Sequence, residues 1–251
     1  MYMLIAAAVL LPLLGTALGA CAALFLNNRL PESLNRGCSG FAAGVMTAAS
    51  VWSLLIPALE QSLREGALSA AFAVGGFGAG VGGMLALERA AEWLYRQKRG
   101  GALSGVAFMI LAVTLHNLPE GLAVGVACAG LADNAGAAAG AMALSLGIAL
   151  QNIPEGAIIS LPLRAQGKSR AKACGCGVAS GAVEPVAAAV ALLAAAPVAR
   201  MMPLLLCFAA GAMIYVTVQE LIPEAVTERT RLGSLSFAAG FALMMTMDVL
   251  L

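Results

Sequence analysis

Eight long apolar segments constrain this chain more than any other feature of its sequence. A bilayer core is about 30 Å thick, so a helix rising about 1.5 Å per residue needs about 20 apolar residues to cross it. Membrane β-barrel strands are shorter, about 10 residues, and alternate in hydrophobicity, which these segments do not. The sequence therefore predicts an all-α, polytopic membrane protein with eight transmembrane helices. The segments cover residues 3–26, 39–59, 67–88, 103–131, 136–163, 173–196, 201–222 and 233–250.

The composition indicates one membrane domain and little else. Of the 251 residues, 61% are hydrophobic and 11% are charged, whereas about a quarter of a soluble domain is charged. Because only short connections remain between the segments, we expect residues 1–251 to form a single transmembrane domain. The first segment has no basic flank or cleavage site, so we expect a retained helix. A net charge of +1 argues against a nucleic-acid partner.

The basic residues predict the orientation of the chain. Positively charged loops stay in the cytoplasm, and twelve of the 14 Lys and Arg residues fall on one side of the predicted membrane. We therefore expect that side to be cytoplasmic and both termini to be outside. Glu60, Arg64 and Glu65 are expected in a solvated outer loop. The twelve are Arg29, Arg36, Arg89, Arg96, Lys98, Arg99, Arg164, Lys168, Arg170, Lys172, Arg229 and Arg231, and the other two are Arg64 and Arg200.

Two nearly identical polar motifs, HNLPEG from His116 and QNIPEG from Gln151, interrupt consecutive apolar segments. A charge at mid-membrane costs at least ~2.5–3.5 kcal/mol and marks a functional site by default. His116 and Glu120 are four residues apart, as are Gln151 and Glu155, so each pair shares a helix face. Consecutive helices run antiparallel, so the two pairs should converge as one nitrogen and three oxygen ligands. Such a set suits Zn²⁺, and its lack of sulfur disfavours Cu(I).

Further polar residues extend this prediction. Asn117, Asn152 and Glu184 would form a second metal site that shares Glu155 or Glu120 as a bridge. Each motif also contains a proline, which removes a backbone donor and can free the carbonyl one turn earlier. The alternative is a set of interhelical hydrogen bonds, each worth about 0.6 kcal/mol in membranes, but the duplication and spacing favour an ion site.

Three other interpretations have less support in the sequence. An intramembrane metal-dependent hydrolase would need an open metal position and a base, and the chain has one histidine and no HExxH motif. A purely structural membrane protein would not retain costly buried charges. Cys174-Gly-Cys176 offers two thiols to a soft metal, although buried cysteine is more often a packing residue.

The paired motif resembles helices 4 and 5 of the ZIP family of zinc and iron transporters, specifically the GufA-like branch, which shares glutamine at the position of Gln151. The resemblance covers essentially the whole chain and implies eight helices in a 3+2+3 arrangement. It also implies that helices 1, 4, 5 and 6 carry the metal while helices 2, 3, 7 and 8 form the other unit. Residues 96–102 contain no histidine, unlike the long histidine-rich loop of many members.

The same resemblance implies a two-metal centre and a transport path. The first site would comprise His116, Glu120, Gln151 and Glu155, and the second Asn117, Asn152, Glu155 and Glu184. Neutral Asn152 weakens the second site, because some relatives have Asp there. The path would include Met46, Ser53, Gln219 and Glu220. Gln219 replaces a histidine that is common in the family. Without the resemblance, Met46 would be interpreted as a packing residue.

The sequence thus predicts a transporter, not an enzyme, that imports a divalent cation into the cytoplasm. Zn²⁺ is the leading substrate, and ligand type alone does not rank it against Fe²⁺, Mn²⁺, Co²⁺, Ni²⁺ or Cd²⁺. No cofactor is expected. The partners are the metal ions and the lipid bilayer, with a bacterial inner membrane as the expected location, and the sequence leaves a homodimer open.

Overall fold

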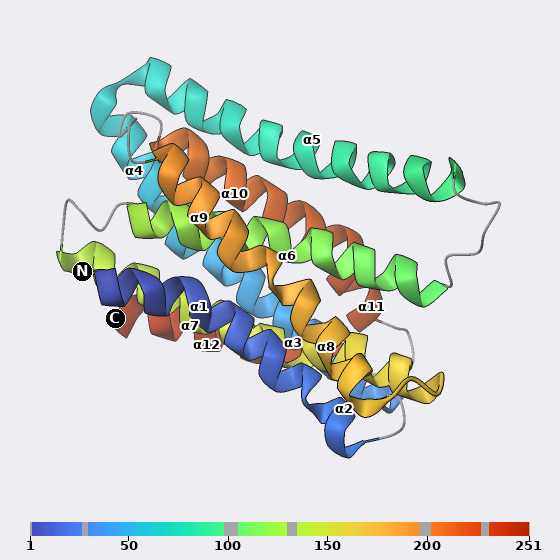
Figure 1. Ribbon diagram of the computed structural model, residues 1–251. Coiled ribbons are helices and arrows are strands. Elements are labelled where there is room, and N and C mark those ends of the chain that lie inside the picture. The colour runs from blue at the N-terminus through green and yellow to red at the C-terminus, as the bar shows by residue number, and fades with distance from the viewer. Residues whose placement is uncertain are drawn as a thin grey trace.

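The computed structural model describes residues 2–26, 30–97, 105–129, 135–195, 202–226 and 231–250, and every element within them is a helix (Figure 1). Seven helical segments in these ranges are long and apolar enough to cross a membrane. Helix α6 (Gly105–Ala129) is not among these seven, but it has 25 residues and is therefore about 37 Å long. The predicted class, an all-α polytopic membrane protein, is confirmed. Helix α1 begins and α12 ends at the same end of the bundle (Figure 1).

Each segment consists of one helix or of two or three consecutive ones. Two of them contain a short π-helical turn, η1 or η4. In chain order the elements are α1 (Tyr2–Ala20), α2 (Ala22–Phe25), α3 (Glu32–Ala49), η1 (Ser50–Leu55), α4 (Ile56–Glu65), α5 (Ala67–Gln97), α6, α7 (Ala135–Ala165), α8 (Arg170–Gly181), α9 (Val183–Ala195), α10 (Met202–Val216), η4 (Thr217–Leu221), α11 (Ile222–Ala225) and α12 (Leu232–Leu250).

Two helices are longer than hydropathy predicts. The second segment was expected over 39–59, but its helices run from Glu32 to Glu65. The expectation that Glu60, Arg64 and Glu65 lie in a loop is therefore wrong, because α4 continues to Glu65. It is followed by Gly66, whose φ of 105° suits glycine. Helix α5 continues past the predicted residue 88 to Gln97. Of the basic residues used for orientation, Arg29, Lys98, Arg99, Arg200 and Arg229 lie outside the described residues.

Prolines mark three places where the helices change form. Turns η1 and η4 each lead directly into an Ile-Pro pair, at Pro57 and Pro223. Proline cannot donate to the carbonyl four residues earlier and crowds it, and a wider π-helical turn accommodates this. Pro185 follows the turn at Ala182 that separates α8 from α9 for the same reason. By contrast, α6 and α7 stay continuous through Pro119 and Pro154.

The bundle exposes large apolar side chains and buries a set of polar side chains within its mainly apolar core. Large apolar side chains such as Leu14, Leu18 and Val190 are more than half exposed, as expected for a surface that faces lipid. The side chains of both HNLPEG and QNIPEG point inward, and His116, Glu120 and Gln151 are at most 3% exposed. The fold therefore gathers the polar residues of the two motifs at the centre of the bundle.

Glycines bring helix backbones into close contact, and they do so within two separate groups. We call α1, α2 and α6–α9 the α6–α7 group, and α3–α5, α10–α12, η1 and η4 the α3–α12 group. In the α6–α7 group, a Cβ would lie within 3.0 Å of a neighbouring backbone at Gly15, Gly19, Gly121, Gly125 and Gly156. In the α3–α12 group, the same holds at Gly40, Gly44, Gly76, Gly80, Gly211, Gly233 and Gly240.

Contacts between the two groups are of a different kind. No glycine of the described residues makes a close backbone contact from one group to the other. Gly147 on α7 does face the α3–α12 group, but there it meets the side chains of Met244 and Val45. Small residues allow close helix packing in membranes, so each group packs tightly within itself and meets the other through side chains.

Candidate metal centre

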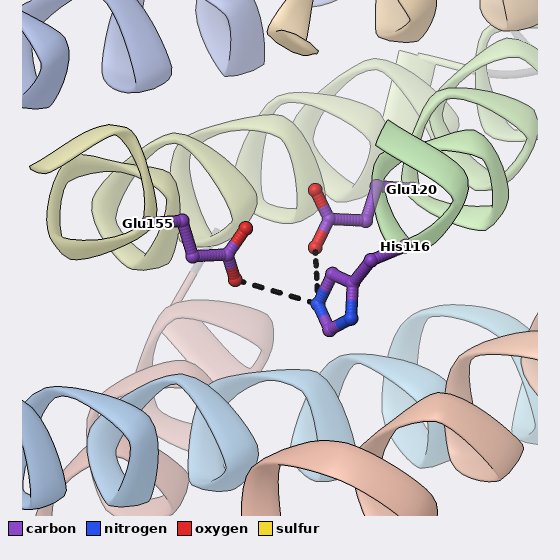
Figure 2. A group of neighbouring side chains, drawn as sticks. All are labelled: His116, Glu120 and Glu155. Carbon is purple, nitrogen blue, oxygen red and sulfur yellow. Dashed lines mark ion pairs between the residues drawn. The ribbon is translucent and has the colours of Figure 1, made fainter. Parts of the chain in front are cut away.

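Three ionisable side chains converge at the middle of the bundle. His116 and Glu120 lie one turn apart on α6, and Glu155 approaches from α7 (Figure 2). The Nε2 atom of His116 is 3.4 Å from Glu155 Oε1 and 3.8 Å from Glu120 Oε1. One ligand atom from each residue lies within 4.8 Å of the others. Among the described residues, this is the one group of three His, Cys, Asp or Glu side chains arranged to hold a metal ion.

Gln151 adds an amide to this group from α7. Its Nε2 donates a hydrogen bond to Glu120 Oε1 across the two helices, and its side chain is fully buried. The amide oxygen has no hydrogen-bond partner within the described part of the chain. Gln151 therefore orients Glu120 and also offers its own oxygen as a ligand.

The centre contains many acceptor atoms that no donor satisfies. A buried oxygen without a partner costs about 1–3 kcal/mol, and such groups in native structures call for an explanation such as an ion. A bound cation would explain these unpaired atoms, since each atom has a lone pair that can bind the cation. Among the described residues that form this centre and the polar cluster beside it, the buried atoms without a hydrogen bond are His116 Nε2, Asn117 Oδ1, Glu120 Oε2, Gln151 Oε1, Asn152 Oδ1, both Glu155 oxygens and Glu184 Oε2.

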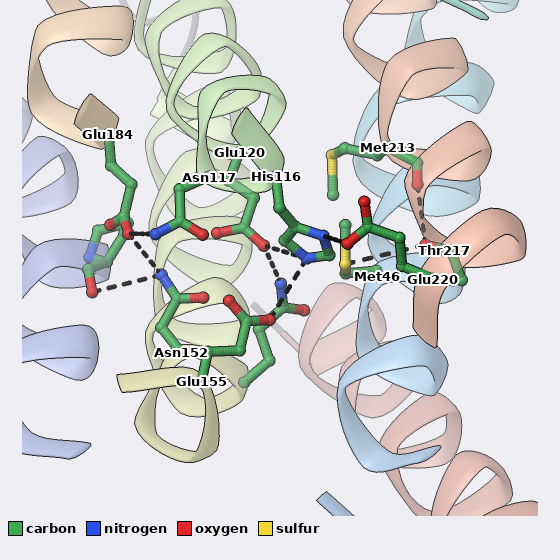
Figure 3. Close-up of polar contacts among 12 residues, drawn as sticks. Met46, His116, Asn117, Glu120, Asn152, Glu155, Glu184, Met213, Thr217 and Glu220 are labelled. Atoms are coloured by element: carbon green, nitrogen blue, oxygen red, sulfur yellow. Dashed lines mark hydrogen bonds and ion pairs between the residues drawn. The ribbon is translucent and has the colours of Figure 1, made fainter. Parts of the chain in front are cut away.

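Glu184 on α9 anchors a second polar cluster beside the first (Figure 3). Its Oε1 accepts hydrogen bonds from Asn117 Nδ2 and Asn152 Nδ2, both at 3.0 Å, and from Thr16 Oγ1 at 2.9 Å. Three donors on one oxygen stabilise an ionised carboxylate. The second oxygen of Glu184 and both asparagine oxygens stay without donors, so this cluster also offers oxygen ligands.

The four residues predicted to line a path lie in different surroundings. Glu220 on η4 points toward the centre, with its Oε2 3.7 Å from His116 Nδ1 (Figure 3). Met46 is fully buried, and its sulfur lies 3.8 Å from Thr217 Oγ1. Ser53 on η1 donates a hydrogen bond to Asp248 Oδ1 at 2.7 Å. Gln219 is exposed and does not join the group around His116.

Two polar residues near these groups were missed by the sequence analysis. Thr16 carries a common residue type in an apolar segment, and nothing in its spacing points to Glu184. Asp248 could have been found, because it is an acidic residue in the last apolar segment. Its Oδ2 is buried and has no hydrogen-bond partner among the described residues.

The cysteine alternative gains no support. The sulfur of Cys174 lies 3.8 Å from that of Cys21, which follows α1. Cys174 and Cys176 do not belong to a three-ligand group within the described ranges.

A bundle of membrane-length helices around a buried, acceptor-rich centre defines an intramembrane cation-binding protein. The family model described as "ZIP Zinc transporter" matches residues 98–248. The chain is 33% identical to zinc transporter ZIP11 of Bos taurus, with 93% of each chain covered. It is 34% identical to zinc transporter GufA of Myxococcus xanthus, with 83% of each covered. It is 37% identical to zinc transporter ZIPB of Bordetella bronchiseptica, over 94% of this chain and 77% of that one.

The chain belongs to the ZIP family of zinc transporters. This membership confirms the family that the two motifs indicate. It also confirms the predicted class of protein, a metal transporter and not an enzyme. It gives no support to the intramembrane hydrolase.

Proposed function

We propose that this chain carries Zn²⁺ across the bilayer into the cytoplasm, through a centre formed by His116, Glu120, Gln151 and Glu155. The observation that carries the proposal is the set of buried acceptor atoms without donors, which a divalent cation would satisfy. One imidazole nitrogen with carboxylate and amide oxygens is a ligand set that Zn²⁺ accepts. The relatives named as zinc transporters support zinc as the cargo.

We propose a second, weaker metal position at Asn117, Asn152 and Glu184, with Glu155 shared between the two positions. Its support is the direction of the hydrogen bonds. The asparagine nitrogens are committed to Glu184 Oε1, which leaves the two amide oxygens and Glu184 Oε2 as acceptors. This position offers no imidazole nitrogen, and two of its ligands are amide oxygens, which are poorer ligands for Zn²⁺, so it should bind zinc less tightly than the first.

Import requires the centre to open to each side of the membrane in turn. The glycine contacts support the α6–α7 group and the α3–α12 group as the units that move against each other, because each is tightly packed within itself. Movement of one helix group against another around a central site is a general transport mechanism. Inward transport, with both termini outside, rests on the uneven distribution of Lys and Arg.

The protein is an integral membrane protein, and we propose a bacterial cytoplasmic membrane as its location. Relatives from Myxococcus xanthus and Bordetella bronchiseptica support this.

The test is uptake of ⁶⁵Zn²⁺ into proteoliposomes by the wild type and by the His116→Ala and Glu155→Ala variants. We expect the wild type to transport zinc and both variants to lose at least about 90% of the rate, since each removes a ligand. Glu60→Ala is the matched control, because Glu60 is an exposed carboxylate on α4 and its loss should leave the rate unchanged. Transport by both variants at the wild-type rate would contradict the proposed centre.

A further inference from the structure

The two ring nitrogens of His116 face the two different helix groups. Nε2 faces Glu120 and Glu155 within the α6–α7 group, at 3.8 and 3.4 Å. Nδ1 faces Glu220 of the α3–α12 group, with Oε2 at 3.7 Å (Figure 3). His116 is therefore the point at which the centre contacts both groups.

A neutral imidazole carries one proton, and a metal ion needs the lone pair of the other nitrogen. If zinc occupies Nε2 beside Glu120 and Glu155, the proton of His116 must be on Nδ1. Metal-binding histidines almost always donate that second N–H to a carboxylate, carbonyl or water. Glu220 is the carboxylate nearest to Nδ1 within the described part of the chain.

We propose that Glu220 is a positioning residue that accepts the Nδ1–H of His116 and so presents Nε2 to the zinc ion. This inference rests on the proposed function, because it takes His116 as a zinc ligand. The distance of 3.7 Å is longer than a hydrogen bond, so the proposed contact requires the side chains of His116 and Glu220 to approach each other when the site is occupied.

The placement of Glu220 links this role to the transport cycle. Glu220 lies in η4, on the group opposite the one that supplies the zinc ligands, so its contact with Nδ1 depends on how the two groups are placed. When the groups move apart, His116 loses its acceptor and becomes a weaker ligand. Zinc affinity would then fall as the site opens, which is the differential affinity that a conformational change needs in order to be coupled to binding.

Glu220 could instead be a zinc ligand or a plain contact between helices. As a ligand of the same ion it should approach Nε2, but its oxygen lies beside Nδ1, and the three-ligand group does not include it. As a plain contact it would have no effect on the protonation of the ring. Which nitrogen of the His116 ring carries the proton, and which one binds zinc, therefore distinguishes the three roles.

His116 is the only histidine of the chain, so ¹⁵N-histidine labelling gives one Nδ1 and one Nε2 signal. The full-length protein in lipid nanodiscs would be recorded with and without Zn²⁺, alongside zinc affinity and thermal unfolding. For the wild type with Zn²⁺ we expect a metal-bound Nε2 and a protonated Nδ1. In Glu220→Ala we expect the Nδ1–H signal to shift and zinc affinity to fall by about 10–100-fold.

Glu220→Gln keeps an acceptor oxygen and should recover most of the affinity, with a smaller shift of Nδ1. Because Glu220→Gln preserves the shape of the side chain, it tests the positioning role even if Glu220→Ala does not fold. Glu224→Ala is the matched control. Glu224 lies one turn further along the same segment and accepts hydrogen bonds from Asn35 and Ser39. Its loss should therefore shift neither nitrogen signal of His116.

Two outcomes would overturn the positioning role while leaving the proposed zinc centre intact. One is zinc on Nδ1 with the proton on Nε2. The other is an Nδ1 signal that stays unmoved in both Glu220 variants. If Zn²⁺ shifts neither nitrogen of the wild type, the proposed centre itself is wrong, and the positioning role falls with it.

Discussion

Thr16 donates a hydrogen bond from Oγ1 to Glu184 Oε1 at 2.9 Å, linking the first transmembrane segment to the sixth. Thr16 and Glu184 are both fully buried. With the two asparagines, Thr16 completes the donors on Oε1, and the other oxygen of Glu184 is left without a donor among the described residues. This contact explains a polar residue in α1 that shows no pattern in the sequence.

Thr16→Val should weaken the second metal position without removing any ligand. Valine matches threonine in shape but leaves Glu184 one donor short, and a hydrogen bond to a charged group contributes about 1.5–3 kcal/mol. We expect a lower free energy of unfolding by about that amount and a zinc affinity about tenfold weaker. Isothermal titration calorimetry and thermal unfolding measure both effects. Thr16→Ser keeps the hydroxyl and should stay close to wild type; equal losses in both variants would show that packing matters instead.

Gln151→His should tighten zinc binding. An imidazole nitrogen is a better zinc ligand than an amide oxygen, and the amide oxygen of Gln151 already lies among the atoms without donors. We expect affinity to rise by about tenfold, or about 1.4 kcal/mol. Uptake at saturating zinc should slow, because release becomes harder. Equilibrium dialysis and ⁶⁵Zn²⁺ uptake test the two parts, and weaker binding by the variant would argue that Gln151 acts only through Glu120.

The glycine that ends each motif should not tolerate substitution by alanine. A Cβ at Gly121 would lie 2.3 Å from the carbonyl oxygen of Glu184, and one at Gly156 would lie 2.0 Å from that of Thr16. The helices would have to separate, which costs about 1–3 kcal/mol in a packed core and displaces Glu184. We expect Gly121→Ala and Gly156→Ala to lower the unfolding temperature and zinc uptake. Gly78→Ala is the control, since nothing lies within 4 Å of its Cβ position, and similar damage there would refute the contact argument.

Zinc uptake should fall as the pH is lowered from neutral. Glu120 and Glu155 bind metal as carboxylates, so protons compete with zinc for both. Binding is therefore favoured at higher pH and lost as the carboxylates take up protons. Initial uptake rates in proteoliposomes at a fixed free zinc concentration provide the measurement, with a zinc ionophore in protein-free vesicles as the control. A rate that climbs steadily from neutral to acid pH would contradict this prediction.

Much of the fold was predictable because lipid imposes a simple length rule on apolar segments. The errors occur where the rule does not apply. Helix α4 reaches Glu65 although Glu60 and Arg64 are charged, since a helix can continue beyond the hydrocarbon and satisfy its own backbone. The π-helical turns were not predicted, although the Ile-Pro pairs at Pro57 and Pro223 signal them in retrospect.

The candidate centre was more predictable than its surroundings. His116, Glu120, Gln151 and Glu155 share a spacing of four residues, and that spacing alone places each pair on one face. The role of Thr16 depends on which helices pack together, and no local pattern encodes that. Gln219 and Glu220 are adjacent in the sequence, yet only Glu220 points toward His116, because η4 determines which way each side chain projects.

The sulfur of Met244 lies where a side chain at Gly147 would be, at the boundary between the two helix groups. A thioether on rotatable bonds can exchange one set of neighbours for another at little cost, whereas two helix backbones in direct contact cannot. In the movement proposed above, the contacts that rearrange would therefore be the side-chain contacts at the boundary between the two groups. Shear of one group against the other would leave the glycine contacts within each group intact.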